Sequence, residues 1–167
     1  MISFQTTTQE FQDFCIKKKS VITGESFRKK PMDSRYHVVI LDILDEDDVA
    51  MPGWQMQITV RPITKDYCEE SYSIFKTIGG KREYPIARLD VQPRDKPSHR
   101  EPDGTIFTGA HLHEFNSVYD MKDSFEFDCE DCKNRIDWLK LFANRYNISI
   151  MEKEQEMTLL GGWECSA

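Results

Sequence analysis

The chain has 167 residues, of which 39% are hydrophobic and 31% charged, with ten Phe, six Tyr and three Trp. This length supplies one domain with its own core, and the apolar content excludes global disorder. The formal charge of -7 excludes a surface that holds nucleic acid by bulk electrostatics alone. We assign residues 1–157 to a single domain and residues 158–167 to a tail.

The cysteines and the N-terminal segment bear on the compartment. Five cysteines form an odd set without regular spacing. Residues 1–20 carry Gln, Thr and Asp where a secretory signal would be apolar. No stretch approaches the ~20 apolar residues of a membrane-spanning helix. We therefore expect a soluble protein in a reducing cytoplasm, with no membrane partner.

The first part of the chain combines one helix with strands. Residues 6–19 place phenylalanines at helical spacing behind a Thr-x-x-Glu capping box, which predicts a helix. The nearly continuous apolar run 36–44 predicts a strand that is buried on both faces. Polar and apolar residues alternate over 54–60, which predicts a half-buried strand that ends at Pro62.

The middle of the chain reads as strands joined by turns. Residues 71–78 and 82–91 flank a Gly-Gly pair, which predicts a hairpin. Residues 92–105 contain three prolines and a glycine, so we expect an irregular, exposed loop. Strand character returns over 108–115. Short connections of this kind favour an antiparallel sheet.

The C-terminal part predicts a helix over about 130–145, capped by Asp128 and amphipathic in its pattern, followed by a short strand over 151–157. Together these elements predict an α+β fold. It would consist of an antiparallel sheet of about five strands with an N-terminal and a C-terminal helix packed on it.

The candidate site rests on the period of two in a strand. Arg88 and Asp90 must share a face of one strand, and His111 and His113 must share a face of another. If these strands pair, the four side chains gather on one face, and His99 joins them from the loop.

This set contains the parts of a metal-independent acid/base site that needs no cofactor. An imidazole has an unperturbed pKa near ~6.5, a carboxylate can orient it, and an arginine can bind a phosphate. Cleavage of RNA requires a general base, a general acid and a cation. In that mechanism His111 or His113 is the base, the other or His99 is the acid, and Arg88 binds the phosphate.

Three other interpretations remain open. The histidines could instead bridge loop carbonyls and brace the long loop. A zinc site is also possible, because His-x-His followed by Cys-x-x-Cys supplies four ligands of the usual types. Its members would be His111, His113, Cys129 and Cys132. Alternatively, Asp90 and Asp103 could join the histidines around a divalent metal.

The motifs Arg-Leu-Asp (88–90), His-Arg-x-Pro-Asp-Gly (99–104) and Gly-x-His-Leu-His (109–113) resemble an uncharacterised domain family of bacterial and prophage or other mobile-element proteins, over roughly residues 75–147. That resemblance implies a mobile-element setting and no established reaction. Arg-x-Asp followed by His-x-His is more loosely similar to small ribonuclease-like toxins of toxin–antitoxin pairs. This similarity implies that the catalytic set is Arg88, Asp90, His111 and His113. The longer loop with His99 departs from the toxin signature.

Three functions follow as expectations. The first is a ribonuclease-like toxin with a histidine cluster, whose partners would be RNA and an antitoxin. The second is a non-catalytic acidic protein that binds and blocks a host defence factor. The third is a zinc-braced binding module.

Overall fold

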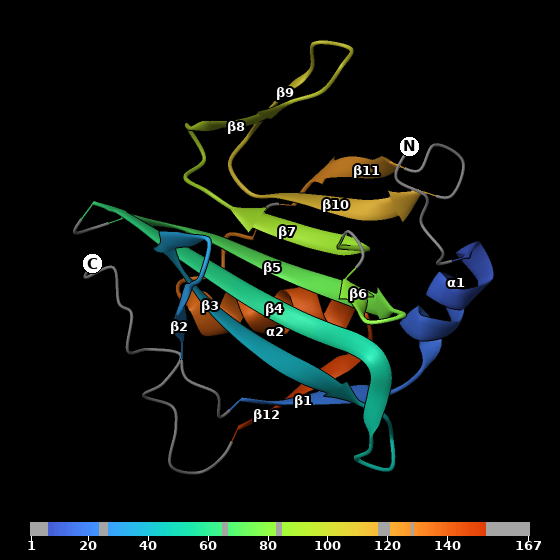
Figure 1. Ribbon diagram of the computed structural model, residues 1–167. Coiled ribbons are helices and arrows are strands. Elements are labelled where there is room, and N and C mark those ends of the chain that lie inside the picture. Colours follow the sequence, from blue (N-terminus) through green and yellow to red (C-terminus); the bar gives the residue numbers. More distant parts are fainter. Residues whose placement is uncertain are drawn as a thin grey trace.

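The structure is a computed structural model, and it describes residues 7–23, 27–64, 67–82, 85–116, 121–127 and 129–152. Most of these residues lie in strands. Two helices accompany them within the described ranges, α1 (Thr8–Ile16) near the N-terminus and α2 (Arg135–Arg145) late in the chain (Figure 1). Neither helix has the length and apolarity needed to cross a membrane.

One sheet dominates the described residues. Eight strands follow one another in the order β11-β10-β7-β5-β4-β3-β1-β12, with β2 added beside β3 and β6 beside β5. A separate hairpin consists of β8 (Pro97–Arg100) and β9 (Ile106–Thr108). The ten strands of the sheet are β1 (Lys19–Thr23), β2 (Arg28–Lys30), β3 (Asp33–Leu44), β4 (Ala50–Thr64), β5 (Tyr67–Ile78), β6 (Lys81–Arg82), β7 (Ala87–Val91), β10 (His111–Asn116), β11 (Met121–Glu126) and β12 (Ile148–Glu152).

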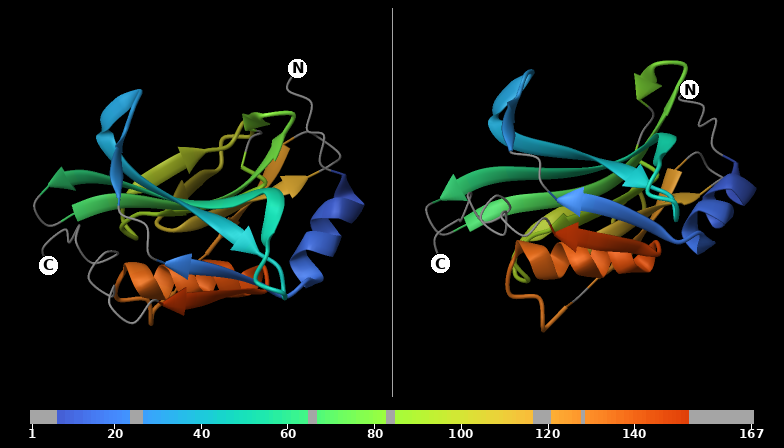
Figure 2. Two further views of the ribbon diagram at one scale, coloured as in Figure 1. Left: turned by 60° about the horizontal axis from the view of Figure 1, so that its bottom comes forward. Right: turned by 90° about the horizontal axis from the view of Figure 1, so that it is seen from below.

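The predicted five-stranded antiparallel α+β fold is wrong. The protein is mostly β, and its sheet is larger, curled and mixed, because β1 pairs in parallel with β12 (Figure 2). The N-terminal helix ends at Ile16, so Lys19 belongs to β1 and not to the last helical turn. The pairing of β1 with β12 joins segments from opposite ends of the chain. Such a pairing leaves no local signal in the sequence, so the prediction did not include it.

Several local predictions agree with the structure. The Gly79–Gly80 pair has positive φ angles of 58° and 75° and turns β5 into β6, as a hairpin requires. The irregular loop predicted over 92–105 is wrong in part, because residues Pro97–Arg100 form β8 and pair with β9 just beyond that range. Helix α2 begins later than predicted, with Asn134 as its N-cap. Asp128 and residues 153–167 lie outside the described residues.

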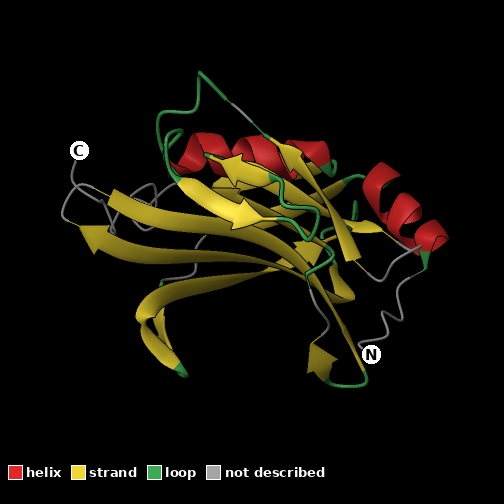
Figure 3. Cartoon of the chain, turned by 90° about the horizontal axis from the view of Figure 1, so that it is seen from above, coloured by secondary structure: helices red, strands yellow, loops and turns green. Residues whose placement is uncertain are grey.

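The sheet has two faces, and α2 lies against one of them, here named the covered face (Figures 2 and 3). Cross-strand neighbours from four strands form its centre, and each is 0% exposed: Ile58, Tyr72, Leu89 and Leu112. The ring of Phe142 from α2 packs at a tilt against Tyr72, with 6.2 Å between centroids. Helix α1 closes one end, where Phe14 stacks on Trp54 at 4.0 Å.

The opposite side of the sheet is here named the open face. Successive side chains of a strand point to opposite faces, so each core residue has a neighbour on the open face. Thr59, Ser71, Asp90 and His111 form such a row, one residue along from the core row. The strand register that aligns the core residues on the covered face therefore also aligns the candidate site residues on the open face.

Candidate functional site

Four of the predicted site residues meet on the open face. His111 pairs with Asp90 across the β7–β10 ladder, and His113 pairs with Arg88. The Nε2 atoms of His111 and His113 both lie 3.5 Å from Oδ2 of Asp90. Arg88 reaches the same oxygen at 2.7 Å through Nη2 and at 3.0 Å through Nε. We call these four residues the Asp90 cluster.

The cluster is buried to different depths. The side chains of His111 and His113 are 2% and 8% exposed, while those of Asp90 and Arg88 are 16% and 39% exposed. Burial raises the pKa of Asp90, but a hydrogen bond from His113 and the charges of Arg88 and the imidazoles outweigh it and bring the pKa to about 2. Asp90 is therefore an ionised carboxylate at neutral pH.

His111 is held in place by the β8–β9 hairpin and its connection to β10. Its Nδ1 lies 2.9 Å from Oγ of Ser98 and 3.3 Å from the carbonyl oxygen of Gly109. The ring of Phe107 stacks on the imidazole at 5.9 Å. His111 thus braces this hairpin, as one interpretation of the sequence anticipated, while its other nitrogen faces Asp90.

Two predicted residues play a different part or lie beyond description. The backbone of His99 lies in β8 opposite Phe107, but its side chain is outside what the structure describes. Asp103 is exposed and accepts the Thr105 amide at 2.8 Å, and this hydrogen bond lowers the pKa of its carboxyl. Asp103 therefore shapes a turn and does not belong to the carboxylate–imidazole group found among the described residues.

A groove of about 610 Å³ runs beside the Asp90 cluster on the open face. Arg88 and Asp90 form part of its wall, whereas the two imidazoles lie behind that wall. Other polar side chains line it, among them Gln57, Ser71, Ser73 and Ser98, and so do the carboxylates of Glu69 and Glu70. None of these residues was predicted for the site. The alternation within β4 and β5 was a usable signal for Gln57, Ser71 and Ser73, because it sends every second side chain to this face.

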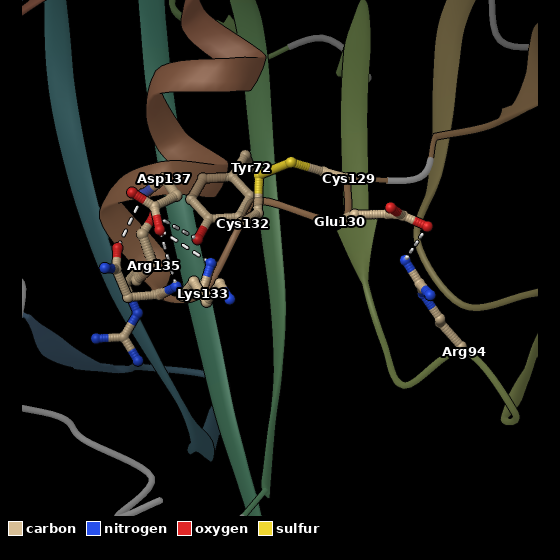
Figure 4. The surroundings of a disulfide bond; sticks show 9 residues. Tyr72, Arg94, Cys129, Glu130, Cys132, Lys133, Arg135 and Asp137 are labelled. Atoms are coloured by element: carbon tan, nitrogen blue, oxygen red, sulfur yellow. Dashed lines mark hydrogen bonds and ion pairs between the residues drawn. A yellow bond between two sulfur atoms is a disulfide. The ribbon is translucent and has the colours of Figure 1, made fainter.

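The predicted zinc set does not converge. Cys129 and Cys132 form a disulfide with a Cα–Cα distance of 5.4 Å in the loop that leads into α2 (Figure 4). They line a hollow of about 500 Å³ together with Trp138 of α2 and with Cys68, which is itself disulfide-bonded. This hollow lies beside the helix that packs on the covered face, whereas the two histidines point to the open face. In Figure 4, Glu130 between the two cysteines pairs with Arg94 at 4.0 Å.

The predicted divalent-metal site of Asp90, Asp103 and the histidines agrees with the structure in part. One ligand atom from each of Asp90, His111 and His113 lies within 4.8 Å of the other two, and within the described part of the chain no other group of three His, Cys, Asp or Glu residues meets this condition. Two imidazoles with one carboxylate are ligands that Zn²⁺ and Fe²⁺ accept. The geometry therefore supports this alternative without Asp103.

Comparison with known proteins gives a family and no activity. A family of unknown function (DUF6978) matches residues 62–155, a range that includes the whole Asp90 cluster. No curated protein matches the chain, and no solved structure matches it. The match confirms that the chain belongs to an uncharacterised family, and the matched range covers residues 75–147.

Proposed function

The chain belongs to this family of unknown function, and we propose that it is a phosphoester-cleaving enzyme whose centre is the Asp90 cluster. One observation carries the proposal. A carboxylate is held between two imidazoles and a guanidinium at the wall of a polar groove that can admit a substrate. Sites in which titratable groups gather beside a hollow are the usual places of acid/base chemistry.

Arg88 is the residue proposed to bind the phosphate. Its side chain is the most exposed of the cluster, and it lines the groove. A guanidinium offers paired N–H donors that match two phosphate oxygens. Asp90, which lines the groove beside Arg88, would then activate the nucleophile together with the two imidazoles that contact it.

RNA is the proposed substrate, in the setting of a mobile-element toxin. An RNA strand carries its own nucleophile, the 2′-hydroxyl, so the protein needs only to remove a proton, stabilise the phosphate and protonate the leaving oxygen. The loose similarity of Arg-x-Asp and His-x-His to ribonuclease-like toxins supports this choice. The negative net charge favours a short single-stranded segment bound by local cations over a long duplex.

The test is cleavage of a fluorescent RNA oligonucleotide by purified protein. We expect Arg88→Ala to lower kcat/KM by about 100-fold or more, the loss typical of removing a group that stabilises transition-state charge. Arg94→Ala is the matched control, because Arg94 pairs with Glu130 beside the other hollow. We expect it to retain wild-type activity.

Expression in a bacterial host supplies a second readout. We expect growth to stop on induction and to recover with Arg88→Ala, provided that circular dichroism shows the variant to be folded. Wild-type protein that leaves RNA intact at equimolar concentration would refute the proposal.

A non-catalytic protein that blocks a host defence factor is the second candidate. Its support is the burial of both imidazoles together with the exposed acidic turn between β3 and β4, at Glu46, Asp47 and Asp48. A pull-down with host lysate distinguishes the two candidates. The second candidate predicts that Asp47→Lys and Asp48→Lys abolish the capture of a host protein and that Arg88→Ala leaves it unchanged.

A further inference from the structure

We propose that Asp90, His111 and His113 form a binding site for one divalent transition-metal ion of the Zn²⁺ type. The ligand atoms would be Oδ2 of Asp90 and Nε2 of each histidine. Their spacing is the first argument. Metal bonds of 2.0–2.1 Å at tetrahedral angles put ligand atoms roughly 3.4 Å apart, and both Nε2 atoms lie 3.5 Å from Oδ2.

The orientation of His111 is the second argument. The carbonyl oxygen of Gly109, 3.3 Å from Nδ1, can only accept a hydrogen bond. The Ser98 hydroxyl lies 2.9 Å from Nδ1 and 3.4 Å from the carbonyl oxygen of Phe107, so it can accept from Nδ1–H while it donates to Phe107. In the tautomer that satisfies both contacts the proton is on Nδ1, and the lone pair of Nε2 faces the carboxylate. Metal-binding histidines are commonly held by such a hydrogen bond at the other nitrogen.

The supporting strands are the third argument. The three ligands sit on adjacent strands, and their neighbours Leu89 and Leu112 are fully buried in the core. Packing of that kind keeps the ligand backbone in position before an ion arrives. Little reorganisation would then be needed on binding.

The burial of the imidazoles is the fourth argument. Direct proton exchange with a substrate requires an imidazole that the substrate can reach, and these side chains are 2% and 8% exposed. A metal ligand has no such requirement. Asp90 lines the groove, so the open coordination position of the ion would face the groove and take a water molecule.

This inference rests on the proposed function only for the chemistry of the ion. A bound Zn²⁺ lowers the pKa of its water to about 7. The resulting hydroxide would take the proton of the 2′-hydroxyl and become water, the 2′-oxygen would bond to phosphorus, and the bond to the 5′-oxygen would break. The metal-bound water then returns a proton to the leaving oxygen. Arg88, released from Asp90 by the competing cation, would bind the phosphate.

The experiment is a metal titration of full-length protein stripped with EDTA and kept in buffer without thiols, so that the disulfide remains closed. Zn²⁺ is measured by calorimetry and by elemental analysis after dialysis. Co²⁺ serves as a spectroscopic probe, because its visible bands report the coordination geometry. We expect one equivalent of each ion, with a low-symmetry tetrahedral or five-coordinate Co²⁺ spectrum.

Substitutions define the site. Loss of a supporting hydrogen bond costs metal sites about 10–100-fold in affinity, so Ser98→Ala should weaken binding within that range and Asp90→Asn or His113→Gln should weaken it further. His37→Gln is the matched control, since three strands separate β3 from β10. Arg88→Ala should bind the ion more tightly, because a competing positive charge is removed.

The outcomes separate the inference from the proposed function. Absence of saturable binding by the wild type, or equal binding by Asp90→Asn, overturns the metal site. RNA cleavage that persists in EDTA overturns the catalytic role of the ion and leaves a metal-independent enzyme, while the titration alone decides whether the site binds a metal. Metal binding with the expected variant pattern, but without cleavage of any phosphoester, retains the site and refutes the hydrolase.

Discussion

The covered face and the open face are built by the same strands, yet they differ in almost every property. Ile58, next to Thr59 in β4, is fully buried, and Leu89, next to Asp90 in β7, is as well. The covered face is a row of large apolar side chains under α2, whereas the open face carries hydroxyl, amide and charged groups along a groove.

This difference shows how a single register serves two purposes. A shift of β10 by one residue against β7 would move Leu112 out of the core and turn His111 and His113 away from the face that carries Asp90. The core therefore keeps the site aligned. Substitutions that conserve the core should change the open face without unfolding the protein.

The largest expected effect comes from removing a side chain of the covered face. Ile58→Ala should lower the free energy of unfolding by about 2–5 kcal/mol, because it deletes buried methyl groups and leaves a cavity. Thr59→Ala, the adjacent residue on the open face, should cost less than about 1 kcal/mol. Urea unfolding of both variants measures the contrast, and equal losses would break the distinction between the two faces.

Asp90 is the exception on the open face, because it is a mostly buried charge. Its pKa of about 2 lies below the unfolded value of about 3.9, so it stabilises the folded state above pH ~4 and this contribution is lost as the pH falls toward 2. The loss should be about 2–3 kcal/mol. The free energy of unfolding, measured in EDTA between pH 5 and pH 2, should therefore decrease more steeply with falling pH for the wild type than for Asp90→Asn. Parallel profiles would show that the cluster does not hold an ionised Asp90.

The disulfide tests the loop that leads into the helix of the covered face. Cys129 and Cys132 close a very short ring. In the chain-entropy description short rings contribute least, so loss of this disulfide should cost below about 2 kcal/mol. Thermal unfolding of Cys129→Ser/Cys132→Ser and of the wild type, both without a dithiol so that the disulfide at Cys68 stays closed, measures this cost. Complete unfolding of the variant would mean that the covered face depends on this link more than its core implies.

The smallest expected effect concerns a hydroxyl on the covered face. The Tyr72 hydroxyl donates to Glu70 at 2.7 Å and lies 3.1 Å from the Arg135 carbonyl oxygen. Tyr72→Phe should cost about 1 kcal/mol, since Glu70 keeps its pairing with Arg135 at 3.0 Å. Tyr36→Phe is the control on the groove side and should be nearly neutral. A much larger loss of stability in Tyr72→Phe would mean that the hydrogen bonds of this hydroxyl stabilise the fold as strongly as core packing does.

Much of the site was predictable from local pattern. A period of two places Arg88 with Asp90, and His111 with His113, whatever the fold, and the structure confirms that the two pairs share one face. The burial of the imidazoles was not predictable, because it depends on Phe107 and on the packing of the β8–β9 hairpin. The partnership of Cys129 with Cys132, and not with the histidines, likewise depends on which face each segment reaches.

The sequence by itself determined the strand periodicity, the Gly-Gly hairpin, both helices in outline and the pairs of residues that must point the same way. These features follow from backbone geometry over a few residues. The tertiary structure alone decided that β1 lies beside β12, that the sheet has many more strands than predicted, and that one carboxylate meets two imidazoles beside a groove. Such contacts join segments far apart in the chain, and their formation depends on the cooperative burial of a common core, which no local pattern records.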